Sequence, residues 1–321
     1  MFASVVLAAA TLLAPAMPAN CTKAVTFTGT ICAPATAGKH PAIVLLGGSE
    51  GGDSMAQVAP QFAAQGYVAA SVAYFGLPGL PKLLELVPVE TVGGALAELA
   101  KRPDVDPNRI AIFGISKGGE LAMLAASTYP QVRAVVAAVP SPFGWESIPN
   151  GPVSAPRSSW SAAGKPVPFV PYVAAMGQAI AQSYMQQKPL DFRPGYAASM
   201  ADKSAVAAAM FHLENIHGPV LCLAAQDDQI WDSPAQCAIA MNYLQANHHA
   251  YADASTVYPG AGHVFLFATA QQPLIQAGQN GVQILLGGTA QANVAAGQQA
   301  WPKIFTFVGT ALQAASSPQG K

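Results

Sequence analysis

A serine flanked by glycines is the strongest chemical signal in the 321-residue chain. Gly114-Ile115-Ser116-Lys117-Gly118 follows an apolar strand pattern at residues 109–113 and precedes a helical pattern. A serine on such a strand-to-helix turn has a strained backbone, and small residues two positions to either side prevent clashes. The turn lifts the hydroxyl off the sheet, beside the free N–H groups of the helix. The pattern predicts that Ser116 is a nucleophile; the alternative is a glycine-rich structural turn.

A nucleophilic serine on such a turn needs an acid and a base, which follow it in the chain order Asp, then His. Asp227 and Asp228 come directly after a strand pattern at residues 219–225, where the acid belongs. His263 lies in a glycine-rich loop after the last strand pattern. We predict that Asp228 orients His263 and that His263 is the base. For either Asp the alternative is turn formation or helix capping. The remaining histidines follow no such strand: His40, His212, His217, His248 and His249.

A glycine-rich loop after an early strand can supply backbone donors to an oxyanion. Residues 45–52 read LLGGSEGG, and the amide of Gly48 or Ser49 is one candidate donor. The second candidate is the amide of Lys117, which follows the nucleophile. The alternative is a glycine-rich turn with no catalytic part. A phosphate-binding interpretation fails, because the sequence has no GK[ST] and no dinucleotide fingerprint with its distal acid.

The elements that must position these residues alternate between strand and helix from residue 23 to 315. Such alternation predicts an α/β fold with a mostly parallel, doubly wound sheet and right-handed crossovers. The predicted strands are 25–31, 41–46, 67–74, 108–113, 132–139, 219–225 and 255–258. The predicted helices are 56–64, 89–101, 118–127, 172–186, 196–211, one that starts at Ser233-Pro234, and 292–315. Residues 20–321 are expected to form a single domain.

Residues from about 140 to 218 interrupt the alternation, because they are rich in Pro, Ser and Gly and contain no strand pattern. So long a stretch inside an α/β domain predicts a helical cap over the active site. We predict that Trp160 and Phe169 of this insert line the substrate pocket together with Trp231. The alternative is that these aromatic side chains only bury the insert against the sheet.

The charge of the chain excludes some classes of partner. It has 15 basic and 16 acidic residues, a formal net charge of -1 and no run of Lys or Arg. No basic field exists for a nucleic acid or an anionic membrane surface. The expected partner is a small-molecule substrate; an oligomeric state is not predicted.

The N-terminus predicts export. An apolar run at residues 1–13 is followed by the small-residue patterns APA and MPA, which resemble signal-peptidase sites. The run is too short to span a bilayer, so we predict a signal peptide at residues 1–19 and no membrane span. No Lys or Arg precedes the run, and the alternative is an ordinary apolar segment of a cytoplasmic protein.

The four cysteines do not indicate a metal site. The sequence has no CxxC and no Cys/His cluster with metal-ligand spacing, and the chemistry predicted above needs no cofactor. In an exported chain Cys21 and Cys32 could form a disulfide across a hairpin. Cys222 falls in an apolar strand and Cys237 in the next helix. For that pair, small buried hydrophobic residues are at least as good an interpretation.

Four motifs carry a resemblance to a known family: GISKGGEL at residues 114–121, GGSEGG at 47–52, DDQIW at 227–231 and YPGAGH at 258–263. They resemble the C-terminal catalytic domain of the acyl-CoA thioesterase / bile acid-CoA:amino acid N-acyltransferase family, in the dienelactone-hydrolase-like part of the α/β hydrolases. The likeness runs from about Pro41 to Phe307. It implies an acyl-enzyme mechanism with Ser116, Asp228 and His263. The acyltransferase branch uses a cysteine nucleophile, so a serine indicates water as the acceptor.

The chain also differs from this family in two respects. Family members of animal origin carry an N-terminal sandwich domain, whereas about twenty mature residues precede the sheet here. The substrate implied by the family, an acyl-CoA, is cytosolic, which conflicts with a signal peptide. We therefore expect a serine hydrolase that cleaves an acyl thioester or ester. One alternative is an exported carboxylesterase or dienelactone-hydrolase-like enzyme on small esters. Another is a non-catalytic binding protein, disfavoured because all three triad residue types are in place.

Overall fold

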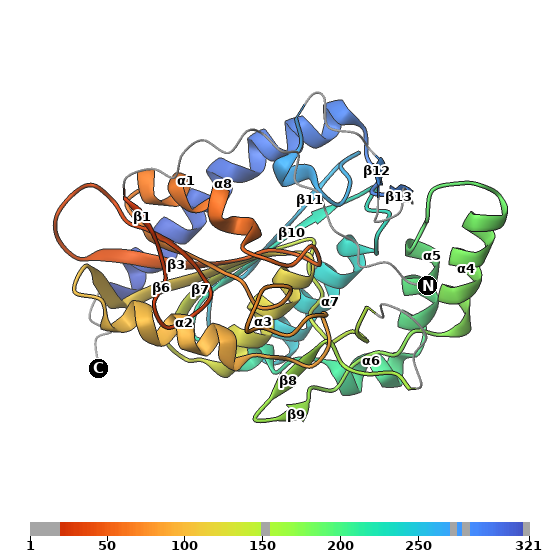
Figure 1. Ribbon diagram of the computed structural model, residues 1–321, viewed down its shortest axis with the longest axis horizontal. Helices are drawn as coiled ribbons and strands as arrows, with labels where there is room; N and C mark the ends of the chain where they lie inside the picture. The colour runs from red at the N-terminus through yellow and green to blue at the C-terminus, as the bar shows by residue number, and fades with distance from the viewer. Residues whose placement is uncertain (1–19, 149–154, 270–274, 278–282, 317–321) are drawn as a thin grey trace.

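Eight strands form the central sheet, in the order β1-β2-β4-β3-β6-β7-β10-β11 (Figure 1). The computed structural model describes residues 20–148, 155–269, 275–277 and 283–316. All pairings from β4 to β11 are parallel, and β1 and β2 are antiparallel to their neighbours. The mostly parallel sheet predicted from the alternating pattern is confirmed. The strands are β1 Cys21–Lys23, β2 Gly29–Cys32, β3 His40–Leu46, β4 Val68–Val72, β6 Val105–Ile115, β7 Val132–Ala138, β10 Val220–Ala225 and β11 Ala254–Tyr258.

Helices cover both faces of this sheet, as the doubly wound prediction requires (Figure 1). One face packs against α1 (Ala59–Ala64) and α8 (Ala290–Ser316), and the other against α2 (Glu90–Lys101), α3 (Lys117–Thr128) and α7 (Ser233–Ala246). Strand β6 shows how both cores arise from one apolar run. Ile110 and Ile112 join the core under α2, α3 and α7, while Phe113 joins the core under α1 and α8. Successive side chains of a strand point to opposite faces of the sheet. A sheet with helices on both faces therefore needs strands that are apolar at nearly every position.

The insert leaves the sheet after β7 and returns at β10. It contains α4 (Ala174–Met185), α5 (Arg193–Met200), α6 (Lys203–Ala209) and the short η2 (Leu213–Asn215). The single helix predicted at residues 196–211 is wrong, because Asp202 interrupts it and caps α6 through its carboxylate. Two short strands, β8 (Trp160–Ala162) and β9 (Lys165–Pro166), were not predicted; β8 pairs with both β5 (Val87–Pro88) and β9. The insert has its own core, which includes Phe143, Trp145, Met176, Tyr196 and Trp231.

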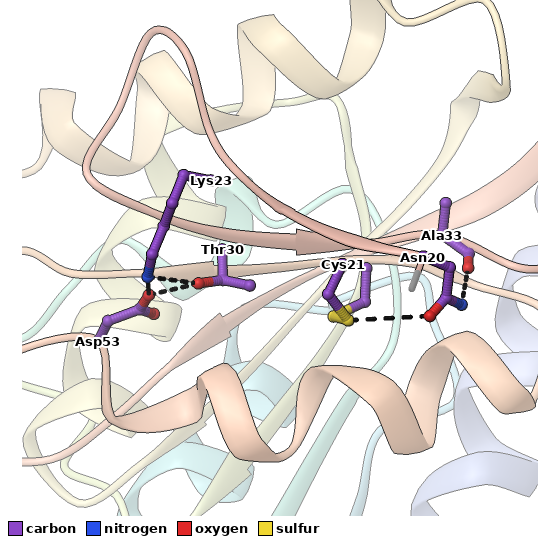
Figure 2. The surroundings of a disulfide bond; sticks show 7 residues. Asn20, Cys21, Lys23, Thr30, Ala33 and Asp53 are labelled. Atoms are coloured by element: carbon purple, nitrogen blue, oxygen red, sulfur yellow. Dashed lines mark hydrogen bonds and ion pairs between the residues drawn. A yellow bond between two sulfur atoms is a disulfide. The ribbon is translucent and has the colours of Figure 1, made fainter. Parts of the chain in front are cut away.

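The N-terminal segment forms a hairpin, and the strand predicted at residues 25–31 is confirmed only for residues 29–31, which belong to β2. Residues 24–28 bend between β1 and β2, and Val25 is 90% exposed. Cys21 and Cys32 are directly opposite each other in this hairpin and form a disulfide, a pairing that the sequence left open. Figure 2 shows Lys23 and Thr30, on the same hairpin, meeting the carboxylate of Asp53. The predicted signal peptide at residues 1–19 lies outside the described residues.

A second disulfide joins the sheet to a helix. Cys222 of β10 and Cys237 of α7 are bonded, so their interpretation as separate buried hydrophobic residues is wrong. The cross-link spans the loop that contains Asp228. Three further short elements complete the described chain: η1 (Ser54–Gln57), η3 (Phe265–Phe267) and the ribbon β12 (Ile275–Ala277) with β13 (Gln283–Leu285). Within the described ranges, no helix has the length and apolar character needed to cross a membrane.

Candidate active site

The structure brings Ser116, His263 and Asp228 into one hydrogen-bonded chain. His263 Nε2 lies 2.8 Å from Ser116 Oγ, and His263 Nδ1 lies 2.9 Å and 3.0 Å from the two carboxylate oxygens of Asp228. The three side chains follow β6, β11 and β10 and meet at the carboxyl edge of the sheet. Ser116 is 8% exposed, His263 2% and Asp228 0%. With these contacts an imidazole could act as a base toward the Ser116 hydroxyl while the Asp228 carboxylate orients it, in a largely dry environment.

Ser116 occupies the tight turn that its sequence motif predicts. Its φ of +56° and ψ of -122° place a non-glycine residue in a rarely populated region. Strand β6 ends at Ile115 and α3 begins at Lys117, so no residue separates the turn from either element. A Cβ on Gly114 would lie 2.0 Å from the carbonyl oxygen of Gly118. A Cβ on Gly118 would lie equally close to the carbonyl oxygen of Gly47. Glycine is therefore required at both positions, because the neighbouring backbone leaves no room for a side chain.

The two neighbouring aspartates have different surroundings. Asp227 is exposed, whereas the buried Asp228 accepts hydrogen bonds from the amides of Ile230 and Trp231 through Oδ1, at 3.0 Å and 3.3 Å. Its main chain is also held from the insert, because Arg193 Nη1 donates to the Asp228 carbonyl oxygen at 2.9 Å. Of the pair, only Asp228 contacts His263, which is the choice predicted from the sequence.

The glycine-rich loop after β3 lies against the nucleophile. A Cβ built on Gly48 would lie 3.4 Å from Ser116 Cβ. The Gly48 amide donates to Glu50 Oε1 at 2.9 Å, so it already has an acceptor within the loop. Across the described residues, no protein acceptor is found for the amides of Ser49 and Lys117. Of the three candidate oxyanion donors, these two are free to bind a ligand.

A buried ion pair next to the nucleophile was missed by the sequence analysis. Lys117 Nζ lies 2.7 Å from Glu120 Oε2, with side chains 2% and 0% exposed. Glu120 Oε1 accepts from the Trp145 amide at 3.0 Å and from the Trp160 indole at 2.6 Å. Burial lowers the pKa of the Lys117 amine and raises that of the Glu120 carboxyl, and the pairing opposes both shifts. Glu120 thus connects the helix behind the nucleophile to the insert.

We expect Glu120→Gln to lower the free energy of unfolding by about 3–5 kcal/mol, because it leaves the Lys117 ammonium buried without its counter-charge. Chemical denaturation measures the change. The double variant Lys117→Met/Glu120→Gln removes both charges and should recover most of the loss. The matched control is Asp106→Asn, which breaks the partly exposed i,i+3 pair with Arg109 and should cost less than about 1 kcal/mol. Equal losses at the two pairs would contradict the expectation.

The three predicted pocket residues differ in exposure. Trp160 is fully buried, stacked under Lys117 Nζ at 5.2 Å with its indole N–H on Glu120. Trp231 is 1% exposed; its ring packs edge-on against His263 at 5.7 Å and its indole N–H donates to the Val139 carbonyl oxygen. Phe169 alone is half-buried. The pocket assignment stays a prediction, and Phe169 is the member with accessible surface.

A sequence profile of the family described as "BAAT / Acyl-CoA thioester hydrolase C terminal" matches residues 87–314. Mouse mitochondrial acyl-coenzyme A thioesterase 2 is 28% identical over 281 residues, covering 87% of this chain and 57% of the relative. Human acyl-coenzyme A thioesterase 1 is 27% identical over 287 residues, covering 87% of this chain and 62% of the relative. The chain thus spans less than two thirds of the length of these relatives.

Solved structures with similar folds are α/β hydrolases. A putative dienelactone hydrolase from Klebsiella pneumoniae superposes with a TM-score of 0.52 at 16% identity, covering 87% of this chain and 91% of that one. The thermostable carboxylesterase EstE1 from a metagenomic library gives 0.51 at 16% identity, covering 95% and 92%. At this identity the likeness shows the fold alone.

Proposed function

This chain belongs to the BAAT / acyl-CoA thioester hydrolase C-terminal family, and on that basis we propose that it is a serine hydrolase that cleaves an acyl thioester or ester through an acyl-enzyme. The hydrogen-bonded chain from Ser116 through His263 to Asp228 is the observation that carries the proposal. Nucleophile, base and orienting acid are each in contact with the next, and Ser116 is the most exposed of the three, at 8%.

The proposed reaction follows from the positions of these atoms. His263 Nε2 takes the proton of the Ser116 hydroxyl as Oγ forms a bond to the acyl carbonyl carbon. The carbonyl oxygen becomes negative and is bound by the amides of Ser49 and Lys117. The bond to the leaving thiol or alcohol then breaks, and His263 returns the proton to it. Water, deprotonated by the same nitrogen, releases the acid and restores Ser116.

The cysteine content supports a serine as the nucleophile and water as the acceptor. All four cysteines are in disulfides, so the chain offers no thiol to attack an acyl group. The family resemblance associates acyl transfer to an amino acid with a cysteine nucleophile, whereas the turn here holds Ser116. These two observations favour hydrolysis.

The two disulfides favour a second candidate substrate class. Disulfides persist in oxidising compartments and are rare in the cytosol. We propose that the protein is exported, with residues 1–19 as its signal peptide. An exported hydrolase would not meet cytosolic acyl-CoA, and a small carboxylic ester is then the second candidate. A binding protein without activity is disfavoured, because the triad is complete in its contacts.

A matched substrate panel distinguishes the candidates. Acyl-CoA thioesters and p-nitrophenyl esters with the same acyl chains, from short to long, are assayed with purified protein. We expect turnover that is lost on modification of Ser116 by a fluorophosphonate. A higher kcat/KM on the thioesters supports the first candidate, and a higher value on the esters supports the second. Folded protein that turns over neither series and does not react with the fluorophosphonate would overturn the proposed function.

A further inference from the structure

The phenol of Tyr74 contacts the glycine-rich loop that faces the nucleophile. Tyr74 follows β4, its side chain is 3% exposed, and its hydroxyl lies 2.7 Å from the carbonyl oxygens of both Gly47 and Gly48. Its ring packs against those of Phe75 and Trp160, at 5.3 Å and 5.8 Å. Burial is the main cause that raises the pKa of the Tyr74 phenol well above its usual range, and nearby carboxylates add to it. The hydroxyl therefore keeps its proton and can act only as a donor to these two carbonyls.

This contact fixes the direction of a backbone N–H. The described peptide bonds contain no cis form, and in a trans peptide the C=O and the following N–H point in opposite directions. The Gly48 carbonyl shares its peptide plane with the Ser49 amide. With that carbonyl held by Tyr74, the Ser49 N–H points away from the phenol. The preceding peptide, between Gly47 and Gly48, makes two hydrogen bonds. Its carbonyl oxygen accepts from the Tyr74 hydroxyl, and its N–H donates to Glu50 Oε1.

We propose that Tyr74 is the positioning residue of the oxyanion hole, because its hydroxyl holds the Gly48–Ser49 peptide in the orientation that keeps the Ser49 N–H available to the substrate oxygen. The inference rests on the proposed function. The loop lies against the nucleophile at Gly48, and the Ser49 amide has no acceptor among the described residues. Tyr74 itself does not touch the reacting atoms. It acts by keeping a dipole in place before charge develops, which is how an oxyanion hole stabilises a transition state.

The test is Tyr74→Phe, which removes one oxygen atom and keeps the packing of the ring. We expect kcat to fall about 10- to 100-fold with KM changed less than about twofold, somewhat less than the loss of an oxyanion donor itself. Affinity for a boronic acid or trifluoromethyl ketone, which forms a tetrahedral adduct with Ser116, should fall by a similar factor. The pH dependence of kcat should keep its wild-type shape, because the triad is untouched.

The matched control is Tyr67→Phe, which removes a phenolic oxygen next to the opposite end of β4 and should leave kcat unchanged. Active-site titration with a fluorophosphonate counts competent molecules, so a partly unfolded Tyr74→Phe preparation still gives kcat per folded site. A titrated kcat equal to that of the wild type, or a loss confined to KM, would overturn the role of Tyr74. Failure of the wild-type protein to hydrolyse any substrate would instead overturn the proposed function.

Discussion

Ser116→Ala is expected to lower kcat by about 10⁵- to 10⁶-fold, the typical reduction when the nucleophile of a catalytic triad is removed. In the proposed mechanism the hydroxyl oxygen attacks the acyl carbon and its proton passes to His263 Nε2, which lies 2.8 Å away. The fold should survive, because alanine keeps the Cβ of serine in the same turn. Rates on the best substrate of the panel measure the loss, and circular dichroism with chemical denaturation checks the fold.

A serine on α3, the helix that follows Ser116, provides the control for this variant. Ser127 Oγ donates to the Leu124 carbonyl oxygen in α3, remote from His263 in sequence and in its contacts. Ser127→Ala should keep kcat within about twofold of the wild type, since surface substitutions are generally mild. A fluorophosphonate should label Ser116 alone, as shown by peptide mass spectrometry. Near-wild-type turnover by folded Ser116→Ala, or labelling of another serine, would contradict the mechanism.

Asp228→Asn is expected to lower kcat about ten-thousand-fold, the typical effect of removing the acid that orients the base. In the proposed mechanism the carboxylate accepts from the Nδ1–H of His263, and Nε2 is the acceptor that faces Ser116. An amide in its place can donate to Nδ1 and favours the wrong tautomer. Asparagine is the informative replacement, because its oxygen can still accept from the amides of Ile230 and Trp231. Steady-state kinetics on the preferred substrate measure the loss.

Asp227→Asn is the matched control, since it makes the same change of charge one residue away. Its side chain is exposed and does not reach His263, so we expect less than a fivefold effect on kcat, roughly the scale of a mild surface change. If Asp227→Asn proved the more damaging of the two, Asp227 would be the orienting acid. That result would overturn the assignment of Asp228 and leave the fold and the nucleophile unchanged.

Most of the candidate site could be predicted because its residues follow strands. Ser116 and Asp228 come within three residues of the end of an apolar strand pattern, and His263 lies in the glycine-rich loop after the last strand. The carboxyl ends of parallel strands meet at one edge of the sheet. The position of a residue after its strand therefore indicates that it lies near the other two in space. Glu120 and Tyr74 gave no such signal, because what they do depends on partners that no local pattern reveals. Glu120 meets Trp160 from 40 residues away, and Tyr74 meets Gly47 from 27 residues away.

The errors in the fold prediction have a related cause. Polar and apolar residues alternate at 25–31, yet only residues 29–31 are in a strand, since the pairing of Cys21 with Cys32 places β1 and β2 on either side of a bend at residues 24–28. The periodicity at 196–211 suits one helix, but Asp202 makes capping bonds that begin a new one. Strand β8 depends on pairing with β9 and with β5, and β5 lies about 70 residues earlier in the chain.

The buried bonds of Glu120 have a consequence for how this protein can diverge. Trp145 and Trp160 donate to its carboxylate from the insert, while Lys117 pairs with it beside the nucleophile. The Trp145 donor is a main-chain amide that any residue except proline supplies, so a new insert sequence without the Trp160 indole would leave the buried Glu120 Oε1 with one donor fewer. Substitutions in the insert and in the first turn of α3 are therefore expected to be epistatic, each tolerated only with the other. A change of substrate range by exchange of the insert would have to carry residues 117 and 120 along with it.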